Sequence, residues 1–165
     1  MSVAPSRFMS HLRRSGWREN RQVAVDGRVP SNHPAYQVLS ELGGVSFASR
    51  EWNKILLDFQ YVEEAAEEAR KWTQAYGMRL VGVAEIHNGH GEAYMTEQEH
   101  LIAFSLIHDA CWFLGANLEA AMDALWREER ARPMLLPGQE SVDLYGETIM
   151  GKDPRVILPG TELLS

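Results

Sequence analysis

SGWRENRQVAVDGRVPSNHPAYQVLSELGG, residues 15–44, is the stretch around which we expect the fold to be organised. It opens on a Gly-Trp pair, carries Arg21 shortly afterwards and closes on a Gly-Gly pair. None of these residue types in this order is typical of a catalytic site, and the pattern indicates a scaffold. We expect Trp17 to pack against the junction between the closing helix and the next strand. The alternative is a surface tryptophan that anchors a partner.

The second half of this stretch predicts a short helix over residues 33–42. Pro34 is favourable in a first turn, and Asn32 before it is a possible cap. We expect Gly43 to end the helix in a left-handed conformation and Gly44 to let the chain turn into a strand. Apolar residues at helical spacing predict one packed face, and they are Tyr36, Leu39 and Leu42.

Hydrophobic periodicity places further elements along the chain. Strands are predicted at 45–48, 55–59, 80–86, 92–96 and 101–106, and helices at 62–76 and 118–126, the latter capped by Asn117. Residues 49–53 predict a turn, as does Asn88-Gly89. An N-terminal helix docked through Phe8 and Leu12 competes with a transit peptide as the interpretation of residues 1–18, which contain Arg and Ser but no acidic residue.

Length and composition indicate one soluble domain. The chain has 165 residues, of which 45% are hydrophobic and 24% charged, as in ordinary globular proteins. No apolar run is long enough to span a bilayer, and the N-terminus lacks a signal-peptide core. The single cysteine, Cys111, excludes an internal disulfide and favours a reducing compartment, hence the cytoplasm. We expect it to be a buried, inert thiol.

The net charge of −7 is unevenly distributed. Residues 1–21 contain five arginines and one glutamate, so the rest of the chain sums to −11. An acidic body repels phosphate backbones, which argues against nucleic acid as the ligand and is compatible with a basic protein partner. The alternative is that the acidity only maintains solubility.

Four glutamates fall at the start of the predicted helix 62–76, opposite its apolar stripe. They are Glu63, Glu64, Glu67 and Glu68. Acidic residues in a first turn stabilise a helix through its dipole, so a solvated face explains them without any function. The alternative is that they form part of an acidic docking surface for a protein partner.

A second candidate site surrounds the turn HNGHG. His87 and His90 are flanked by Glu85 and Glu92, and imidazole and carboxylate groups are both ligands for zinc. Because a Gly-rich turn positions ligands poorly, we expect no metal here. His108-Asp109 could orient a catalytic base, but no nucleophile stands in a recognisable setting beside it, which favours a local structural pair.

The opening stretch resembles the third subfamily of the SUKH superfamily. The resemblance is carried by Gly16, Trp17, Arg21, His33, Pro34, Ala35, Leu39, Leu42, Gly43 and Gly44, and by the Leu-Gly turn at Gly115 before a short Leu-bearing helix. It implies an α+β domain over residues 1–130, in which helices flank a mostly antiparallel sheet. Residues 131–165, rich in proline and glycine, are expected to form an irregular extension.

The resemblance also implies a function. Proteins of this superfamily are mostly bacterial immunity proteins, so we expect this chain to bind and neutralise the toxin domain of a polymorphic toxin in the cytoplasm, without a cofactor. Such toxins are often nucleases or nucleic-acid deaminases. Two other hypotheses remain: a small metal-assisted hydrolase centred on His87 and His90, and a protein-binding scaffold unrelated to toxins.

Overall fold

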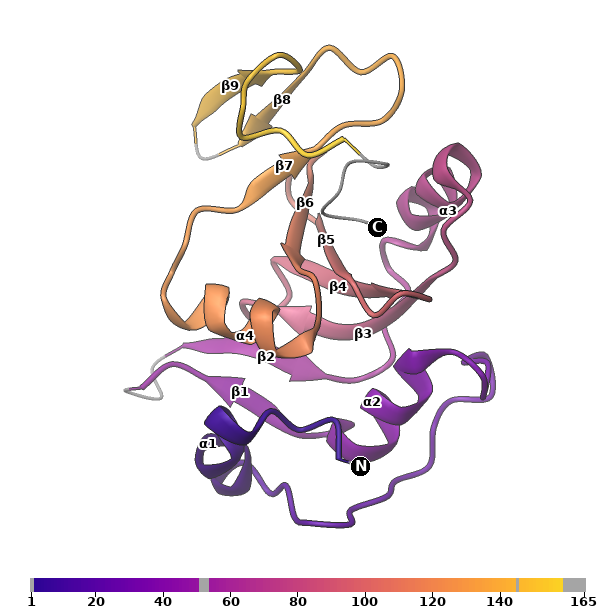
Figure 1. The fold of residues 1–165 in the computed structure, drawn as a ribbon, viewed down its shortest axis with the longest axis vertical. Coiled ribbons are helices and arrows are strands. Elements are labelled where there is room, and N and C mark those ends of the chain that lie inside the picture. Colours follow the sequence, from indigo (N-terminus) through magenta and orange to yellow (C-terminus); the bar gives the residue numbers. More distant parts are fainter. Residues whose placement is uncertain (1, 51–53, 145, 159–165) are drawn as a thin grey trace.

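A computed structural model describes residues 2–50, 54–144 and 146–158 of the chain. Within them, seven antiparallel strands form one sheet in sequence order (Figure 1). These are β1 (Ser46–Ala48), β2 (Ile55–Phe59), β3 (Leu80–Ile86), β4 (Gly91–Thr96), β5 (Leu101–Ser105), β6 (Cys111–Gly115) and β7 (Arg132–Met134). Two further strands, β8 (Ser141–Leu144) and β9 (Glu147–Met150), form a separate hairpin. The expected α+β class with an antiparallel sheet is confirmed.

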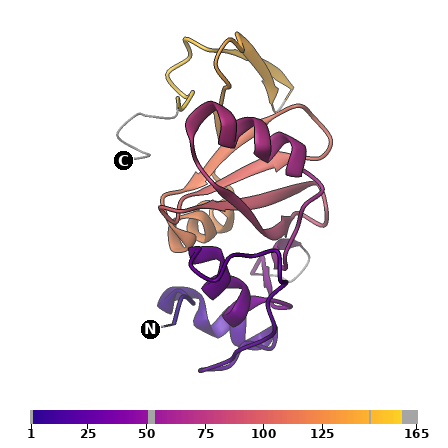
Figure 2. The ribbon, with the colours of Figure 1, turned by 90° about the vertical axis from the view of Figure 1, so that its right-hand side faces the viewer.

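Helices cover both faces of the sheet (Figure 2). They are η1 (Ser6–Phe8), α1 (Met9–Arg14), α2 (Pro34–Leu42), α3 (Ala66–Tyr76) and α4 (Leu118–Trp126). The main core joins α1, α2 and α4 to one face, and a second core joins α3 to the other. Phe8 and Leu12 are both buried, which confirms the docked N-terminal helix. None of these helices, in the described part of the chain, is long and apolar enough to cross a membrane.

The central strands are apolar on both faces because they lie between these two cores. In β5, Leu101 and Ala103 face the first core, whereas Ile102 and Phe104 face the second. Successive side chains of a strand point to opposite faces, so a strand covered on both sides has no polar alternation. This explains why β5 and its neighbours were visible in the sequence as short continuous apolar runs.

The opening stretch stabilises the junction between α2 and β1 through Arg21. Arg21 donates from Nη1 to the carbonyl of Glu41 at 2.9 Å and from Nη2 to the carbonyl of Gly43 at 2.7 Å. The predicted left-handed helix stop at Gly43 is wrong, whereas Gly44 does let the chain turn into β1. Gly43 has φ −50°, and Gly44 has φ +80°. The left-handed residue is therefore Gly44, one position beyond the expected helix stop, because Gly43 still bonds back to the carbonyl of Leu39.

The start of α2 also differs from the expectation. His33, not Asn32, is the cap: its Nδ1 accepts a hydrogen bond from the main-chain N–H of Ala35 at 3.2 Å. The predicted packed face is half correct. Leu39 and Leu42 are buried together with Ala35 and Val38, but Tyr36 is 39% exposed. The helix therefore turns Val38, and not Tyr36, toward the main core.

Trp17 is only 1% exposed and belongs to the main core with Leu42 and Val45. The alternative of a surface tryptophan that anchors a partner is therefore wrong. Its main-chain N–H bonds to the carbonyl of Leu12 at 3.0 Å, and Gly16 before it has φ +100°. The Gly-Trp pair thus reverses the chain after α1 and inserts the indole into the core.

The remaining strand predictions match β2 and β3 and differ by one residue at one end in β1, β4 and β5. β6 and β7 extend the sheet beyond the strands assigned from the sequence. Gly115 ends β6 against α4, where an added Cβ would lie 2.5 Å from the main-chain nitrogen of Ala121. Only glycine permits this close approach. Residues 51–53 of the expected turn at 49–53 lie outside the described residues.

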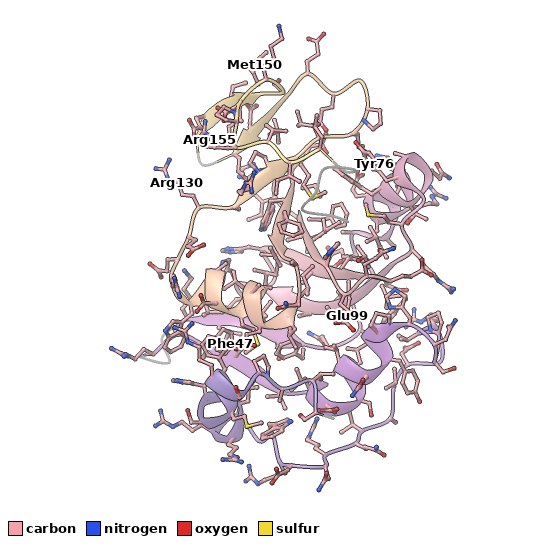
Figure 3. All side chains as sticks on the ribbon, in the orientation of Figure 1. Phe47, Tyr76, Glu99, Arg130, Met150 and Arg155 are labelled. Atoms are coloured by element: carbon pink, nitrogen blue, oxygen red, sulfur yellow. The ribbon has the colours of Figure 1, made fainter. Side chains whose placement is uncertain are left out.

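The described residues between 131 and 158 pack on the rest of the chain. β7 pairs with β6, and Met134 and Leu135 are each 1% exposed. Tyr76 at the end of α3 donates to the carbonyl of Leu135 at 2.8 Å (Figure 3). The hairpin β8–β9 has a small core of its own. The division into a domain of residues 1–130 and an extension of residues 131–165 stays a prediction.

Candidate functional site

The four glutamates near the start of α3 do not share one environment. Glu63 lies before the helix and pairs with Arg28, whose guanidinium stacks over the ring of Tyr61 at 4.6 Å. The hydroxyl of Tyr61 donates to Glu63 at 3.1 Å. Arg28 also binds both carboxylate oxygens of Asp26, and these hydrogen bonds hold the pKa of Asp26 at about 2. Glu63 is therefore already part of a local network.

Glu68 is also paired within the chain. Its carboxylate accepts a hydrogen bond from Nζ of Lys71, one turn further on, at 2.8 Å, and this bond raises the pKa of Lys71. Glu64 and Glu67 differ from it. Both are exposed, and neither has an ion-pair partner among the residues that the structure describes. Of the predicted set, Glu64 and Glu67 are thus the two carboxylates available to another molecule.

The segment that carries Glu64 is held by a buried carboxylate, that of Glu92 on β4, which is 3% exposed. Oε1 accepts from the main-chain N–H of Glu64 at 3.1 Å, and Oε2 accepts from that of Ala65 at 2.8 Å. The hydroxyl of Tyr94 also donates to Oε2, at 3.0 Å. Burial, together with this carboxylate, raises the pKa of Tyr94, so its hydroxyl keeps the proton that it donates.

This arrangement explains why α3 begins at Ala66 and not at residue 62 as predicted. Residues before it lie directly on the sheet: an added Cβ on Gly82 would be 2.0 Å from the carbonyl oxygen of Val62. Free N–H groups at a helix start need acceptors, and here Glu92 supplies them from another strand. The apolar spacing from Val62 onward is real, but it reflects packing on β3 and not a longer helix.

Of the four residues proposed as metal ligands at the His87–His90 turn, Glu92 lies apart from the two histidines. Glu92 points to the α3 face and is bound by three donors, whereas His87 and His90 line a groove beside α4. In the described part of the chain, no group of three or more His, Cys, Asp or Glu side chains is arranged to hold a metal ion. Sequence proximity placed Glu92 with the histidines, but the alternation of the strand separates them.

The other two chemical candidates have structural explanations. The hydroxyl of Ser105 accepts hydrogen bonds from the main-chain N–H groups of Ile107 at 3.1 Å and His108 at 2.9 Å, which shapes the β5–β6 turn. His108 and Asp109 are both exposed in that turn. Cys111 is buried, and burial raises the pKa of its thiol well above the usual value, as expected for an inert cysteine.

One feature of the surface was not visible in the sequence. A groove of about 720 Å³, which we call the α4 groove, lies beside β6, α4 and the α4–β7 connection. Its lining includes Trp112 of β6, Leu125 of α4 and Arg130 of the connection. These residues come from three different elements, and nothing in their local sequence links them. Arg130 and Arg155 project from the same side of the molecule (Figure 3).

Comparison with known proteins gives one result. A family model described as SUKH-3 immunity protein matches residues 4–128. The match covers all the elements from η1 to α4, including the Arg21 junction and the start of α3. No curated protein and no solved structure matches the chain.

Proposed function

Because the chain belongs to the SUKH-3 immunity protein family, we propose that it binds the toxin domain of a polymorphic toxin in the cytoplasm and blocks it. It acts by forming a stoichiometric complex and not by catalysis. The family supports the role of an immunity protein. The acidic net charge of −7 supports a toxin domain with a basic surface. Nucleases and nucleic-acid deaminases have such surfaces, since their substrates are anionic.

The start of α3 is the surface that we propose for the toxin contact. The observation that carries this proposal is the exposure of Glu64 and Glu67 without an ion pair among the described residues. Glu63 and Glu68 contribute negative charge beside them, although each is paired within the chain. A toxin cation would have to displace Arg28 from Glu63 or Lys71 from Glu68. It can bind Glu64 and Glu67 directly.

This surface is also firmly positioned. The Glu92 carboxylate accepts a hydrogen bond from the main-chain N–H of Glu64. Ala69 and Trp72 anchor the following helix, α3, in the second core. A preorganised main chain loses little entropy when the surface binds a partner. Complementary charges mainly accelerate association and set the orientation of the complex. We therefore expect the glutamates to act on the association rate more than on the dissociation rate.

The test is a charge reversal, Glu64→Lys with Glu67→Lys, measured against the toxin domain encoded beside this gene. Association at low salt should slow by roughly tenfold, and the salt dependence of the rate should weaken. The matched control is Glu19→Lys with Glu119→Lys, which changes the net charge equally at two other exposed positions. Equal effects of the two double variants, or no effect of either, would assign Glu64 and Glu67 to a solvated helix face.

The stoichiometric mode has its own measurement. Toxin activity should fall in proportion to the amount of protein added and reach its minimum at a fixed molar ratio. A catalytic protein would inactivate an excess of toxin over time. Continued loss of toxin activity at a small fraction of equivalence would contradict the proposal.

A further inference from the structure

The α4 groove exposes apolar side chains on a molecule that buries most of its others. Ile107, at the β5–β6 turn, is 60% exposed, and Trp112 and Leu125 are half-buried beside it. Small residues on the adjoining face of α4, Ala120 and Ala124, leave the space open. Concave apolar surfaces with a few polar groups are typical of binding sites.

The charges of the groove differ in sign from those of the whole protein. Its lining contains Lys54, Arg130 and Arg132 against Glu128 and Glu129, a net charge of +1 with neutral histidines, whereas the chain as a whole carries −7. The existing pairs are long and solvated. Lys54 and Glu128 are 3.4 Å apart, and Arg130 is 3.8 Å from Glu147 with 78% of its side chain exposed. Such pairs contribute little and exchange readily with other anions.

The edge of the sheet reaches into the same groove. β7 pairs with β6 only from Cys111 to Phe113. Leu114 and Gly115, the last two residues of β6, lie beyond this pairing and line the groove, but both are buried. The end of β6 therefore forms part of the wall of the groove.

From the apolar lining and the charge of the groove we infer that the α4 groove binds an acidic and apolar segment of a protein partner. The segment would place large apolar side chains against Trp112 and Ile107, and direct carboxylates to Lys54 and Arg130. The groove lies on the α4 side of the sheet, whereas Glu64 and Glu67 lie on the α3 side. This inference therefore does not depend on the proposed toxin contact, and the two surfaces select partners of opposite charge.

The experiment uses the full chain and a random peptide library displayed on phage. Peptides that combine acidic and large apolar residues should be enriched. For the best synthetic peptide, Arg130→Glu and Ile107→Asp should each weaken binding by roughly tenfold or more. Both residues are largely exposed, so neither change should lower the melting temperature appreciably. Chemical shifts of the bound protein should change around β6 and α4.

The control separates this inference from the toxin contact. The variant Glu64→Lys with Glu67→Lys should bind the selected peptides as well as the unchanged protein does. No enrichment, enrichment of basic peptides, or binding that is insensitive to Arg130→Glu and Ile107→Asp would overturn the inference. Self-association of the unchanged chain that Ile107→Asp abolishes would also overturn it, since a second copy would then fill the groove. None of these results would alter the expected effect of the glutamates on toxin association.

Discussion

Arg21 and Glu92 both bind main-chain groups at a helix end, at opposite ends of two different helices. Arg21 donates to carbonyl groups at the C-terminal end of α2, and Glu92 accepts from N–H groups just before the N-terminal end of α3. Each charge matches the sign that the helix dipole favours at that end. Each also fixes a helix to the sheet: Arg21 at the entry to β1, and Glu92 from within β4.

They differ in burial and in sequence distance. Arg21 is half-buried and binds groups 20 and 22 residues away, within the stretch that carries the family resemblance. Glu92 is 3% exposed and binds groups 27 and 28 residues away, on a segment that runs over the opposite face of the sheet. The role of a charged residue can be inferred from the sequence when its partners lie in the same motif, as for Arg21. The inference fails when the partners lie on a distant segment, as for Glu92.

Removal of the Glu92 carboxylate should have the largest effect. Glu92→Ala leaves the N–H groups of Glu64 and Ala65 and the hydroxyl of Tyr94 without their acceptor, and each buried unsatisfied donor costs about 1–3 kcal/mol. We expect a loss of about 2–5 kcal/mol in the free energy of unfolding, measured by urea denaturation. Glu92→Gln is the matched variant, since it keeps one acceptor oxygen and should lose less. Equal stability of all three proteins would show that Glu92 does not hold α3.

Removal of Arg21 should have a smaller effect, because its carbonyl partners are closer to solvent. Arg21→Ala should lower the free energy of unfolding by about 1–3 kcal/mol. Arg21→Lys should recover only part of this loss, because an ammonium group does not reproduce the planar fork that reaches two carbonyls. The measurement is again urea denaturation, with Arg18→Ala as a control for the loss of a guanidinium that bonds only within its own turn. Full recovery by lysine would contradict a bidentate role.

The smallest effect is expected from His33, which caps the other end of α2. Burial lowers its pKa, and the hydrogen bond from Nε2 to the carbonyl of Arg79 opposes this shift only in part. The unfolded chain therefore binds more protons than the folded one as the pH falls below about 6.5, and stability decreases in that direction. Protonation of Nδ1 would also remove the acceptor for Ala35.

The check is the difference in free energy of unfolding between pH 8 and pH 5.5, for the unchanged protein and for His33→Asn. Asparagine can still cap the helix but does not titrate, so its pH dependence should be shallower. His11, His87 and His100 also have pKa values lowered mainly by burial, so part of the slope should remain. An identical slope in the variant would show that His33 titrates equally in the folded and unfolded states.

Much of the fold was predictable from the sequence, because local patterns report local structure. Apolar runs located β2 and β3 to the residue, and Asn117 marked the start of α4, where its side chain accepts from the N–H of Ala120. Errors arose where two patterns overlap. Val62 has helical spacing but packs on Gly82 of β3 before the helix begins, and Tyr36 has the spacing of a packed face but remains 39% exposed.

The candidate site was predictable only in outline. Four glutamates near one helix start are evident in the sequence, but their ion pairs with Arg28 and Lys71 separate two of them from Glu64 and Glu67. The pairing with Lys71 follows helical spacing and could have been anticipated. The pairing with Arg28 joins residues 35 positions apart and could not.

By itself, the sequence determined most of the helices and strands, the motif from Gly16 to Gly44 and the acidic balance of the chain. These follow from spacing, composition and the conformational demands of single residues. Tertiary structure alone decided that Glu92 serves α3 and not a metal, that Trp17 is core, and that the α4 groove exists. Each of these depends on which face of the sheet a side chain meets and on what packs there. Contacts between distant segments form only when the sheet is assembled, so no local pattern encodes them.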